Sequence, residues 1–465
     1  MHPEMVSMAR SQRMDPQELE ALMGRVLSYI HHAIPDPPVS VDGDLCILFD
    51  AQGRGLDRIS GLPDALLRNI VLRLPVKDAA RTTALSRRWR PIWYSAPLIL
   101  VDSHLLPAGD DKIPKHVERE DSTAVAAAVS CILAAHPGPI RCAHLTCCYM
   151  DEFRGQVARW LQHLTVKGVQ ELFLINRPWP LDLRRHMPAT IFSMATLTRL
   201  YLGFWRFPDT FGLPRGAAFP YLRELGLCCV IIDDRDIDYI LARSPVLDIL
   251  CFEGHLFTSL KLRLVSQSLR CLQLHGCKVE SITVAGIPVN PSSMVPSLET
   301  LALPVQFGVR NDVKLLPSFL RCFPNLKTLH ILCKTTTEST GRLNLKFWQE
   351  SGAIECIQSH ITMLAFHDFR GERSELAFLK FFIENAQMLK TLVLQFAHGY
   401  VSSETEAKSQ VNALFSGKRG AASCKVMVCQ NRLEEGGDFW DFKRGFDYSD
   451  PFALFRCQGH CLFTV

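Results

Sequence analysis

The 465-residue sequence lacks the features that mark several functional classes. No run approaches the ~20 apolar residues of a membrane-spanning helix, and no apolar stretch typical of a secretory signal follows the N-terminus MHPEMVSMARSQR. A net charge of +4 is too small to mark the whole chain as a binder of nucleic acid or membrane surfaces. We therefore expect a protein of the cytoplasm, the nucleus or both, with roughly two to four domains at this length.

Motifs that position common catalytic or metal-binding groups are also missing. The chain has no phosphate-binding P-loop, HExxH pair, GxGxxG turn or nucleophile elbow. Cys457, His460 and Cys461 come nearest to a zinc site, but a fourth ligand is absent. The aspartates between Asp233 and Asp238 lack the glycine and glutamate of a calcium loop, and instead predict a turn into a helix. We expect no metal, no cofactor and no catalysis by this chain.

The cysteines argue against a disulfide framework. There are 17 of them, an odd number, and several lie beside leucines in apolar runs. With no secretory signal, this pattern favours reduced, buried thiols.

Residues 1–55 form a leader that is partly disordered apart from one amphipathic helix. The segment DPQELEALMGRVLSYIHHAI, residues 15–34, has Asp15 as its N-cap and an apolar stripe from Leu19 to Ile30. This helix either docks on its own chain or binds a partner.

The next segment, LPDALLRNIVLRLPVKDAARTTALSRRWRPIW at 62–93, predicts three short helices. Pro63 suits a first helical position, and Pro75 ends that helix. Asp78 can cap a second helix, and Ser86 a third. We expect Leu67, Val71 and Ala84 to pack these helices together. A unit of roughly 40 residues cannot bury all its apolar surface, so one face must lie against something else.

Basic residues surround this apolar segment. Residues 56–93 carry eight Lys and Arg against three Asp, a local charge of +5. Such a segment could bind phosphates, but its leucines and tryptophans favour a protein-docking face with a basic rim for an acidic partner.

One pattern recurs nine times between about 140 and 396. An apolar-x-x-apolar-x-apolar motif starts at the residues listed here: Val169, Leu197, Leu222, Leu247, Leu269, Leu298, Leu326, Ile361 and Leu389. Successive starts differ by 22 to 35 residues. This spacing is the signature of leucine-rich repeats, in which each coil adds one short parallel strand and buries its leucines on its neighbours. Helices are expected at 122–136, 234–245 and 313–325. The fold class is therefore α/β: three N-terminal helices, then an irregular solenoid with a parallel sheet.

The segment DRISGLPDALLRNIVLRLPVKDAARTTALSRRWRPIWYSAPLILVD, residues 57–102, closely resembles the F-box of the large plant F-box family. A weaker resemblance, to the FBD module that follows leucine-rich repeats in such proteins, covers about 343–395 through Phe347-Trp348, Phe369-Arg370-Gly371 and LAFLKFFIENAQMLKTLVL. We accordingly expect an F-box at 56–102, a leucine-rich-repeat solenoid at 122–342, FBD-like terminal repeats at 343–396 and a C-terminal cap or tail at 397–465.

The resemblance implies a substrate receptor of a Skp–cullin–F-box ubiquitin ligase, in which the F-box binds an acidic Skp-type adaptor that binds a cullin. Ubiquitin transfer then belongs to other subunits. The alternative is an interaction scaffold that joins no active ligase. By motif position, the adaptor contacts are Leu62, Pro63, Leu66, Ile70, Leu74, Pro75, Val76, Leu85, Trp89 and Trp93, although Trp89 could equally serve the internal core. The variable strand residues on the concave face are the candidate substrate contacts, and each could equally be an ordinary surface position: Glu171, Phe173, Arg199, Tyr201, Glu224, Gln273, Thr328 and His330.

Overall fold

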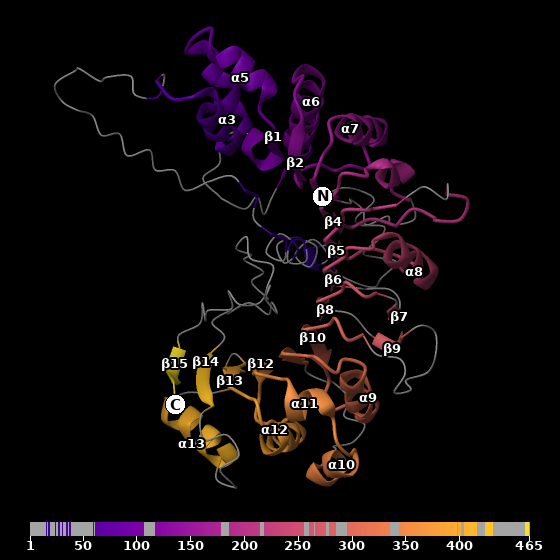
Figure 1. Cartoon of the computed structure of the whole chain (residues 1–465), viewed down its shortest axis with the longest axis vertical. Coiled ribbons are helices and arrows are strands. Elements are labelled where there is room, and N and C mark those ends of the chain that lie inside the picture. The colour runs from indigo at the N-terminus through magenta and orange to yellow at the C-terminus, as the bar shows by residue number, and fades with distance from the viewer. Residues whose placement is uncertain are drawn as a thin grey trace, which may run out of the picture. The chain divides into compact units, whose positions relative to one another are not determined.

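The computed structural model describes residues 59–464 with gaps, and single residues between Asp15 and Pro38. The longest gaps are 107–116, 178–185, 285–294, 335–343, 416–423 and 431–460. The chain packs into two compact units, Met1–Leu222 and Arg223–Val465. Their helices and strands are labelled in Figure 1.

Unit 1 begins with short helices that two prolines position. Helix α3 spans Asp64–Arg73 and α4 spans Val76–Arg81, and they follow Pro63 and Pro75 directly. The second helix therefore begins two residues before the predicted Asp78 cap, because Pro75 already holds the backbone at a φ of −49° at its entrance.

A 3-10 turn, η1 (Thr82–Ala84), then leads to α5, Trp89–Ser95. The third helix starts three residues after the predicted Ser86 cap, and the Ser86 carbonyl accepts a hydrogen bond from the Trp89 N–H at 3.1 Å. Pro91 is accommodated in the first turn of α5, where a backbone N–H has no partner within the helix.

These helices share a small core. It consists of Leu67, Val71, Ala79, Trp89, Ile92 and Ala96. The prediction that Leu67 and Val71 pack internally is confirmed, since both are fully buried. The same prediction for Ala84 is wrong, because η1 turns that residue outward to solvent.

The first repeats follow directly. Unit 1 continues with β1 (Leu98–Val101), η2 (Asp102–Leu105), α6 (Arg119–Ala135), β2 (Ile140–Leu145), α7 (Arg154–Val166), β3 (Glu171–Ile175), η3 (Ala189–Ser193) and β4 (Arg199–Gly203). Strands β1 to β4 pair in that order, all parallel. Helix α6 begins at Arg119, before the predicted start at residue 122, and the Ser122 hydroxyl accepts a hydrogen bond from the Tyr149 N–H at 2.9 Å.

Unit 2 repeats the same strand-and-return plan. Its elements are β5 (Glu224–Cys228), α8 (Asp234–Arg243), β6 (Ile249–Glu253), β7 (Leu260–Leu264), β8 (Cys271–His275), β9 (Val279–Val284), β10 (Thr300–Val305), α9 (Arg310–Arg321), β11 (Thr328–Cys333), α10 (Leu345–Glu350), α11 (Glu355–Ser359), β12 (Met363–Phe369), α12 (Arg373–Asn385), β13 (Thr391–Phe396), α13 (Glu404–Phe415), β14 (Lys425–Gln430) and β15 (Cys461–Thr464). The nine predicted strands are confirmed, each beginning two residues after its motif starts.

Strand pairing in unit 2 is parallel from β5 through β6, β8, β10, β11, β12 and β13 to β14. Strand β15 adds to β14 in the antiparallel direction, and β7 pairs with β9 apart from the main sheet. The α/β class and the parallel sheet of a solenoid are therefore confirmed.

The segment 57–102 packs directly against the first repeat. Strand β1 pairs with β2, and the Leu98 N–H donates to the Pro139 carbonyl at 3.0 Å. The ring of Trp93 lies edge-on to His136, with centroids 4.9 Å apart. Gly138 permits this approach, since a Cβ there would lie 2.5 Å from the Tyr94 carbonyl oxygen. The orientation of α5 relative to β2 is therefore fixed by close contacts.

Three expectations concern what the chain lacks. The cysteines within the described ranges are free, and most are buried. Among the described residues, no three His, Cys, Asp or Glu side chains gather as metal ligands, and the Cys457–Cys461 cluster falls largely outside them. No described helix combines the length and apolar character needed to cross a bilayer.

Candidate functional site

Three large apolar side chains of the 62–93 segment remain exposed. Leu66 and Ile70, one turn apart on α3, are 51% and 37% exposed, and Leu85 is 67% exposed. We call these three residues the docking face. They extend beyond the core because α3 buries its other side, which carries Leu67 and Val71. Protein-binding surfaces commonly expose several large aliphatic side chains close together, as this segment does.

Arg88 brings the two parts of the docking face together. Its guanidinium donates to the Leu62 carbonyl at 2.6 Å and to the Asp64 carboxylate at 2.7 Å. These bonds hold the turn that follows Leu85 against the start of α3. The ion pair itself is exposed, so it contributes at most about 1 kcal/mol to stability.

The remaining predicted contacts divide by burial. Pro63 is exposed, whereas Leu62, Leu74, Pro75 and Trp93 are half-buried. Leu62, Leu74 and Trp93 pack against the F-box core, so they combine an internal role with a partly accessible surface.

Val76 and Trp89 require a correction. They are only 3% and 4% exposed, so neither offers a surface to a partner in this structure. Trp89 belongs to the core cluster, because the late start of α5 turns its side chain inward. The alternative internal role considered for Trp89 is the one observed.

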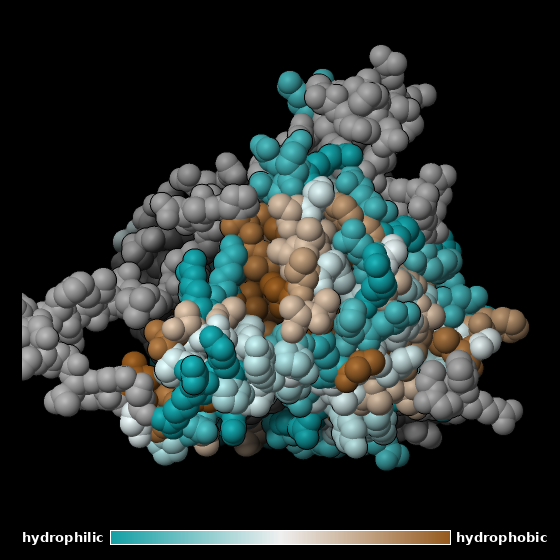
Figure 2. All heavy atoms as spheres, turned by 90° about the horizontal axis from the view of Figure 1, so that it is seen from above, coloured by the Kyte–Doolittle hydropathy of each residue, from teal (hydrophilic) through white to brown (hydrophobic). Residues whose placement is uncertain are grey.

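The surroundings of the docking face are basic. The exposed Lys and Arg side chains of these helices and turns are Arg68, Arg73, Lys77, Arg81, Arg87, Arg88 and Arg90. Figure 2 looks onto the end of the molecule where α3, α5 and α6 lie, and shows apolar side chains gathered among hydrophilic ones. An apolar centre within a cationic rim suits a partner with an acidic surface.

Sequence reasoning missed two exposed apolar residues at either end of this segment of the sequence, Ile59 and Tyr94, which are 54% and 52% exposed. The apolar character of Ile59 was visible in the motif, but only the structure shows that Tyr94 lies outside the core.

It also missed Asp102, the first residue of η2. Its buried carboxylate accepts hydrogen bonds from the N–H groups of Thr146 and Cys147, both at 2.8 Å. Burial raises its pKa to about 6, against the lowering effect of these bonds. Asp102 therefore fastens the end of the F-box segment to the loop after β2.

The candidate substrate contacts are less accessible than expected. Seven of the eight are less than 9% exposed: Glu171, Phe173, Tyr201, Glu224, Gln273, Thr328 and His330. Arg199 is intermediate. The expectation that these seven residues lie open on the surface is therefore wrong for this structure.

In unit 1 these residues form two rows across the strands. His144, Phe173 and Tyr201 are register partners on β2, β3 and β4, and their rings lie 4.9 and 5.1 Å apart. We call them the aromatic row. Beside it, Glu171 pairs with Arg199 at 3.0 Å and with Arg141 at 3.3 Å. Strand leucines alternate with these positions, so both rows lie on the face opposite to the leucines.

In unit 2 the equivalent positions carry polar groups. The Gln273 amide donates to the Glu253 carboxyl at 2.6 Å. Burial raises the pKa of Glu253 to about 8. Because this folded-state pKa exceeds the value of 4.5 for the free side chain, the native chain holds more protons than the unfolded chain between those pH values. This group's contribution to stability therefore falls as the pH rises through that window.

Two histidines continue the polar strand positions of unit 2. The rings of His330 and His367 are bonded at 3.2 Å, and His367 is bonded to the Gln395 side chain at 2.8 Å. Burial lowers the pKa of His367 to about 4, and that of His330 falls as well. Both rings are therefore neutral at physiological pH, and they form a structural hydrogen-bonded chain.

Comparisons with known proteins agree with this arrangement. An F-box domain model matches residues 59–100, which include the docking face. A model described as FBD-associated F-box protein At5g56370, LRR repeats, matches 157–288 and 281–331, and an FBD model matches 349–394. The chain therefore carries an F-box domain, leucine-rich repeats and an FBD module. The limits predicted for its domains are not tested by these matches and stay predictions.

The curated relatives compared with this chain come from Arabidopsis thaliana. F-box/FBD/LRR-repeat protein At1g13570 is 29% identical over 48% of this chain and 50% of its own length. F-box/LRR-repeat protein At3g59200 is 33% identical over 41% of this chain and 36% of its own. The putative FBD-associated F-box protein At3g50710 is 22% identical over 80% of this chain and 100% of its own. The chain thus spans half or less of the length of the first two.

Proposed function

We propose that this chain is the substrate-recognition subunit of a Skp–cullin–F-box ubiquitin ligase. Its F-box binds the Skp-type adaptor, the adaptor binds the cullin, and the repeats hold a protein substrate. F-box/leucine-rich-repeat proteins generally serve as non-catalytic substrate adaptors. The observation that carries the proposal is the exposure of Leu66, Ile70 and Leu85 within the F-box match.

The proposed complex forms by burial of apolar anchors inside a charged rim. Fully burying one large aliphatic side chain contributes about 1.5–3 kcal/mol, so a few anchors suffice for stable association. The basic rim raises the rate of encounter with an acidic adaptor.

The junction between the F-box and the repeats supports the second half of the proposal. The β1–β2 pairing, the Asp102 hydrogen bonds and the close approach at Gly138 hold α5 against the first repeat. A substrate held by those repeats would keep a defined distance from the adaptor. A receptor that does no chemistry itself raises the rate of ubiquitin transfer by holding the substrate in position.

Co-expression with a Skp-type adaptor and a cullin tests the proposal. We expect the adaptor to co-purify with this chain and the cullin to co-purify only when the adaptor is present. A folded chain that binds no Skp-type adaptor would refute it. Adaptor binding without cullin or ubiquitin-transfer activity would instead favour the scaffold alternative. A ligase of this type would act in the cytoplasm or the nucleus, which imaging of a fluorescent fusion checks.

A further inference from the structure

The turn that carries Leu85 has little packing of its own. Residues 84–88 are all exposed, and the F-box core takes Ala79 before the turn and Trp89 after it. The Leu85 N–H donates to the Thr82 carbonyl at 3.0 Å, which is a bond within the turn itself. Burial therefore contributes little to fixing the position of Leu85 relative to the rest of the docking face.

The side chain of Arg88 supplies a long-range connection. Its Nη2 donates to the Leu62 carbonyl at 2.6 Å, and its Nε and Nη2 donate to one oxygen of the Asp64 carboxylate at 3.0 and 2.7 Å. These acceptors lie 26 and 24 residues earlier in the chain. By contrast, Thr82 and Leu85 donate to carbonyls no more than four residues back. The guanidinium of Arg88 thus ties the turn to a distant part of the F-box.

The acceptors of Arg88 lie at the start of α3, close in sequence to the other docking-face residues. They flank Pro63, whose carbonyl accepts a hydrogen bond from the Leu66 N–H at 2.9 Å. Helices α3 and α5 share the F-box core and lie side by side in Figure 1. Arg88, three residues after Leu85, therefore joins the backbone that carries Leu85 to the backbone that carries Leu66.

A fixed turn matters for binding because ordering a flexible one costs free energy. A side chain that is already in position loses less conformational freedom when a partner binds, so it contributes more to affinity. Arginine suits this task, since its planar guanidinium makes several directed bonds at once, whereas lysine has one ammonium group on a flexible stem. The Arg88 and Asp64 side chains are 41% and 53% exposed, so their ion pair adds little to overall stability and acts locally.

We infer that Arg88 is a positioning residue of the docking face: its guanidinium holds Leu85 at a fixed place relative to the apolar residues of α3. Arg88 therefore acts on binding through Leu85 and not by contact with the partner. The inference rests on the proposed role of the F-box in binding an adaptor. It gives Arg88 a task different from the electrostatic one of the basic rim.

A double-mutant cycle on the full chain tests this inference. Isothermal titration measures the Kd for a Skp-type adaptor with the wild type, Arg88→Lys, Leu85→Ala and Leu85→Ala/Arg88→Lys. Lysine keeps the charge of the basic rim but cannot reproduce the bonds of the guanidinium to both acceptors. We expect Arg88→Lys to weaken binding about fivefold in the wild type and less than about twofold in the Leu85→Ala background.

An equal loss in both backgrounds would overturn the inference. A residue that touches the partner, or one that only stabilises the fold, costs the same affinity whether or not Leu85 is present. Undiminished affinity of Arg88→Lys would overturn it as well. The matched control is Arg119→Lys, which lies outside the F-box match, because the Arg119–Glu152 ion pair at 2.9 Å also joins distant segments and leaves the Arg119 side chain 40% exposed. This control should leave the Kd unchanged.

Hydrogen exchange of the free chain gives a second reading that does not depend on the proposed function. The N–H groups of Leu85 and Trp89 are bonded to carbonyls of the turn, so they report on its order. We expect both to exchange at least roughly threefold faster in Arg88→Lys than in the wild type or in Arg119→Lys, with exchange in α3 unchanged. Unchanged exchange in the turn would overturn the inference even if the adaptor binds. A wild-type chain that binds no adaptor would refute the proposed function, whereas the exchange rates would still decide whether Arg88 positions the turn.

Discussion

Replacing the three docking-face residues by alanine should remove adaptor binding while leaving the fold intact. Complete burial of a leucine or isoleucine contributes about 1.5–3 kcal/mol. Leu66, Ile70 and Leu85 keep 51%, 37% and 67% of their surface for a partner. Scaled by these fractions, Leu66→Ala/Ile70→Ala/Leu85→Ala should lose about 2–5 kcal/mol of binding free energy, or roughly 30- to 4,000-fold in Kd.

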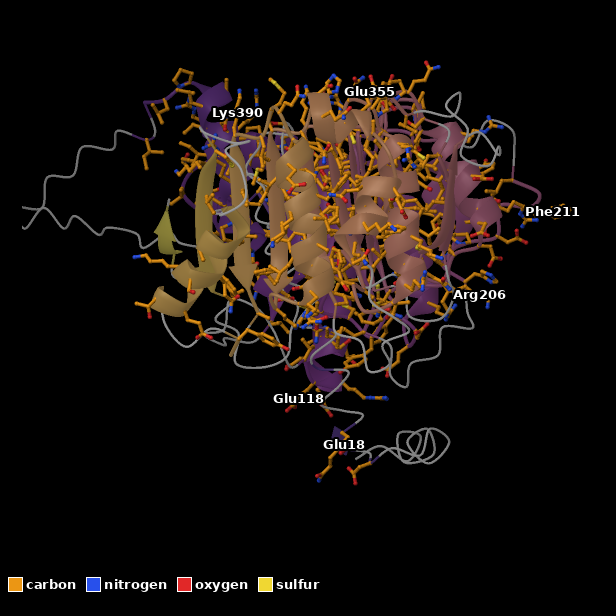
Figure 3. All side chains as sticks on the ribbon, turned by 90° about the horizontal axis from the view of Figure 1, so that it is seen from below. Glu18, Glu118, Arg206, Phe211, Glu355 and Lys390 are labelled. Carbon is orange, nitrogen blue, oxygen red and sulfur yellow. The ribbon has the colours of Figure 1, made fainter. Side chains whose placement is uncertain are left out.

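The part of each side chain that is already buried contributes to folding, and the same scaling gives a cost of about 2–4 kcal/mol in unfolding free energy for the three substitutions together. Binding is therefore compared only for a variant that thermal unfolding shows to be folded. Isothermal titration with a Skp-type adaptor measures the Kd, and thermal unfolding measures stability. Val166→Ala/Phe211→Ala is the matched control, since these residues are 88% and 80% exposed but lie in the repeats; Figure 3 shows Phe211 projecting outward. A folded triple variant within about threefold of the wild-type Kd would refute the reasoning.

Three further predictions concern the junction and the buried acid. Gly138→Ala should destabilise the packing of α5 on the first repeat, because the new Cβ would lie 2.5 Å from the Tyr94 carbonyl oxygen. We expect faster hydrogen exchange in α5, and unchanged exchange would contradict this prediction. Asp102→Ala removes the hydrogen-bond acceptor of the Thr146 and Cys147 N–H groups. It should lower the free energy of unfolding, measured with denaturant, by about 1–3 kcal/mol for each group. A loss below about 1 kcal/mol in total would contradict this account. Glu253→Gln should flatten the decline in stability between about pH 4.5 and 8, since the raised acid pKa is removed; a variant as pH-dependent as the wild type would exclude this assignment.

Repetition made the solenoid predictable from the sequence. Nine returns of one strand motif fix where the strands lie, because each coil must bury its leucines on the next. Single-residue capping signals were less informative. Asp78 and Ser122 have side chains suited to N-caps, yet both lie inside helices that start earlier, because α4 begins at Val76, directly after Pro75, and α6 begins at Arg119.

Burial was the least predictable property. The motif groups Trp89 with Leu85 as partner contacts, but the structure buries Trp89 and exposes Leu85, because α5 begins only after the turn. Burial on the strand face opposite to the leucines was equally hard to predict from the sequence. Phe173 and Tyr201 alternate with leucines as exposed repeat positions do, and no local pattern indicates that both are fully buried.

The most direct test of the central claim is hydrogen exchange of the full chain with and without a Skp-type adaptor, read by mass spectrometry. The account predicts new protection in α3 and in the turn from Thr82 to Arg88, with no change in the strands of unit 2. Protection confined to the repeat strands, or absent from α3 at a saturating adaptor concentration, would contradict it.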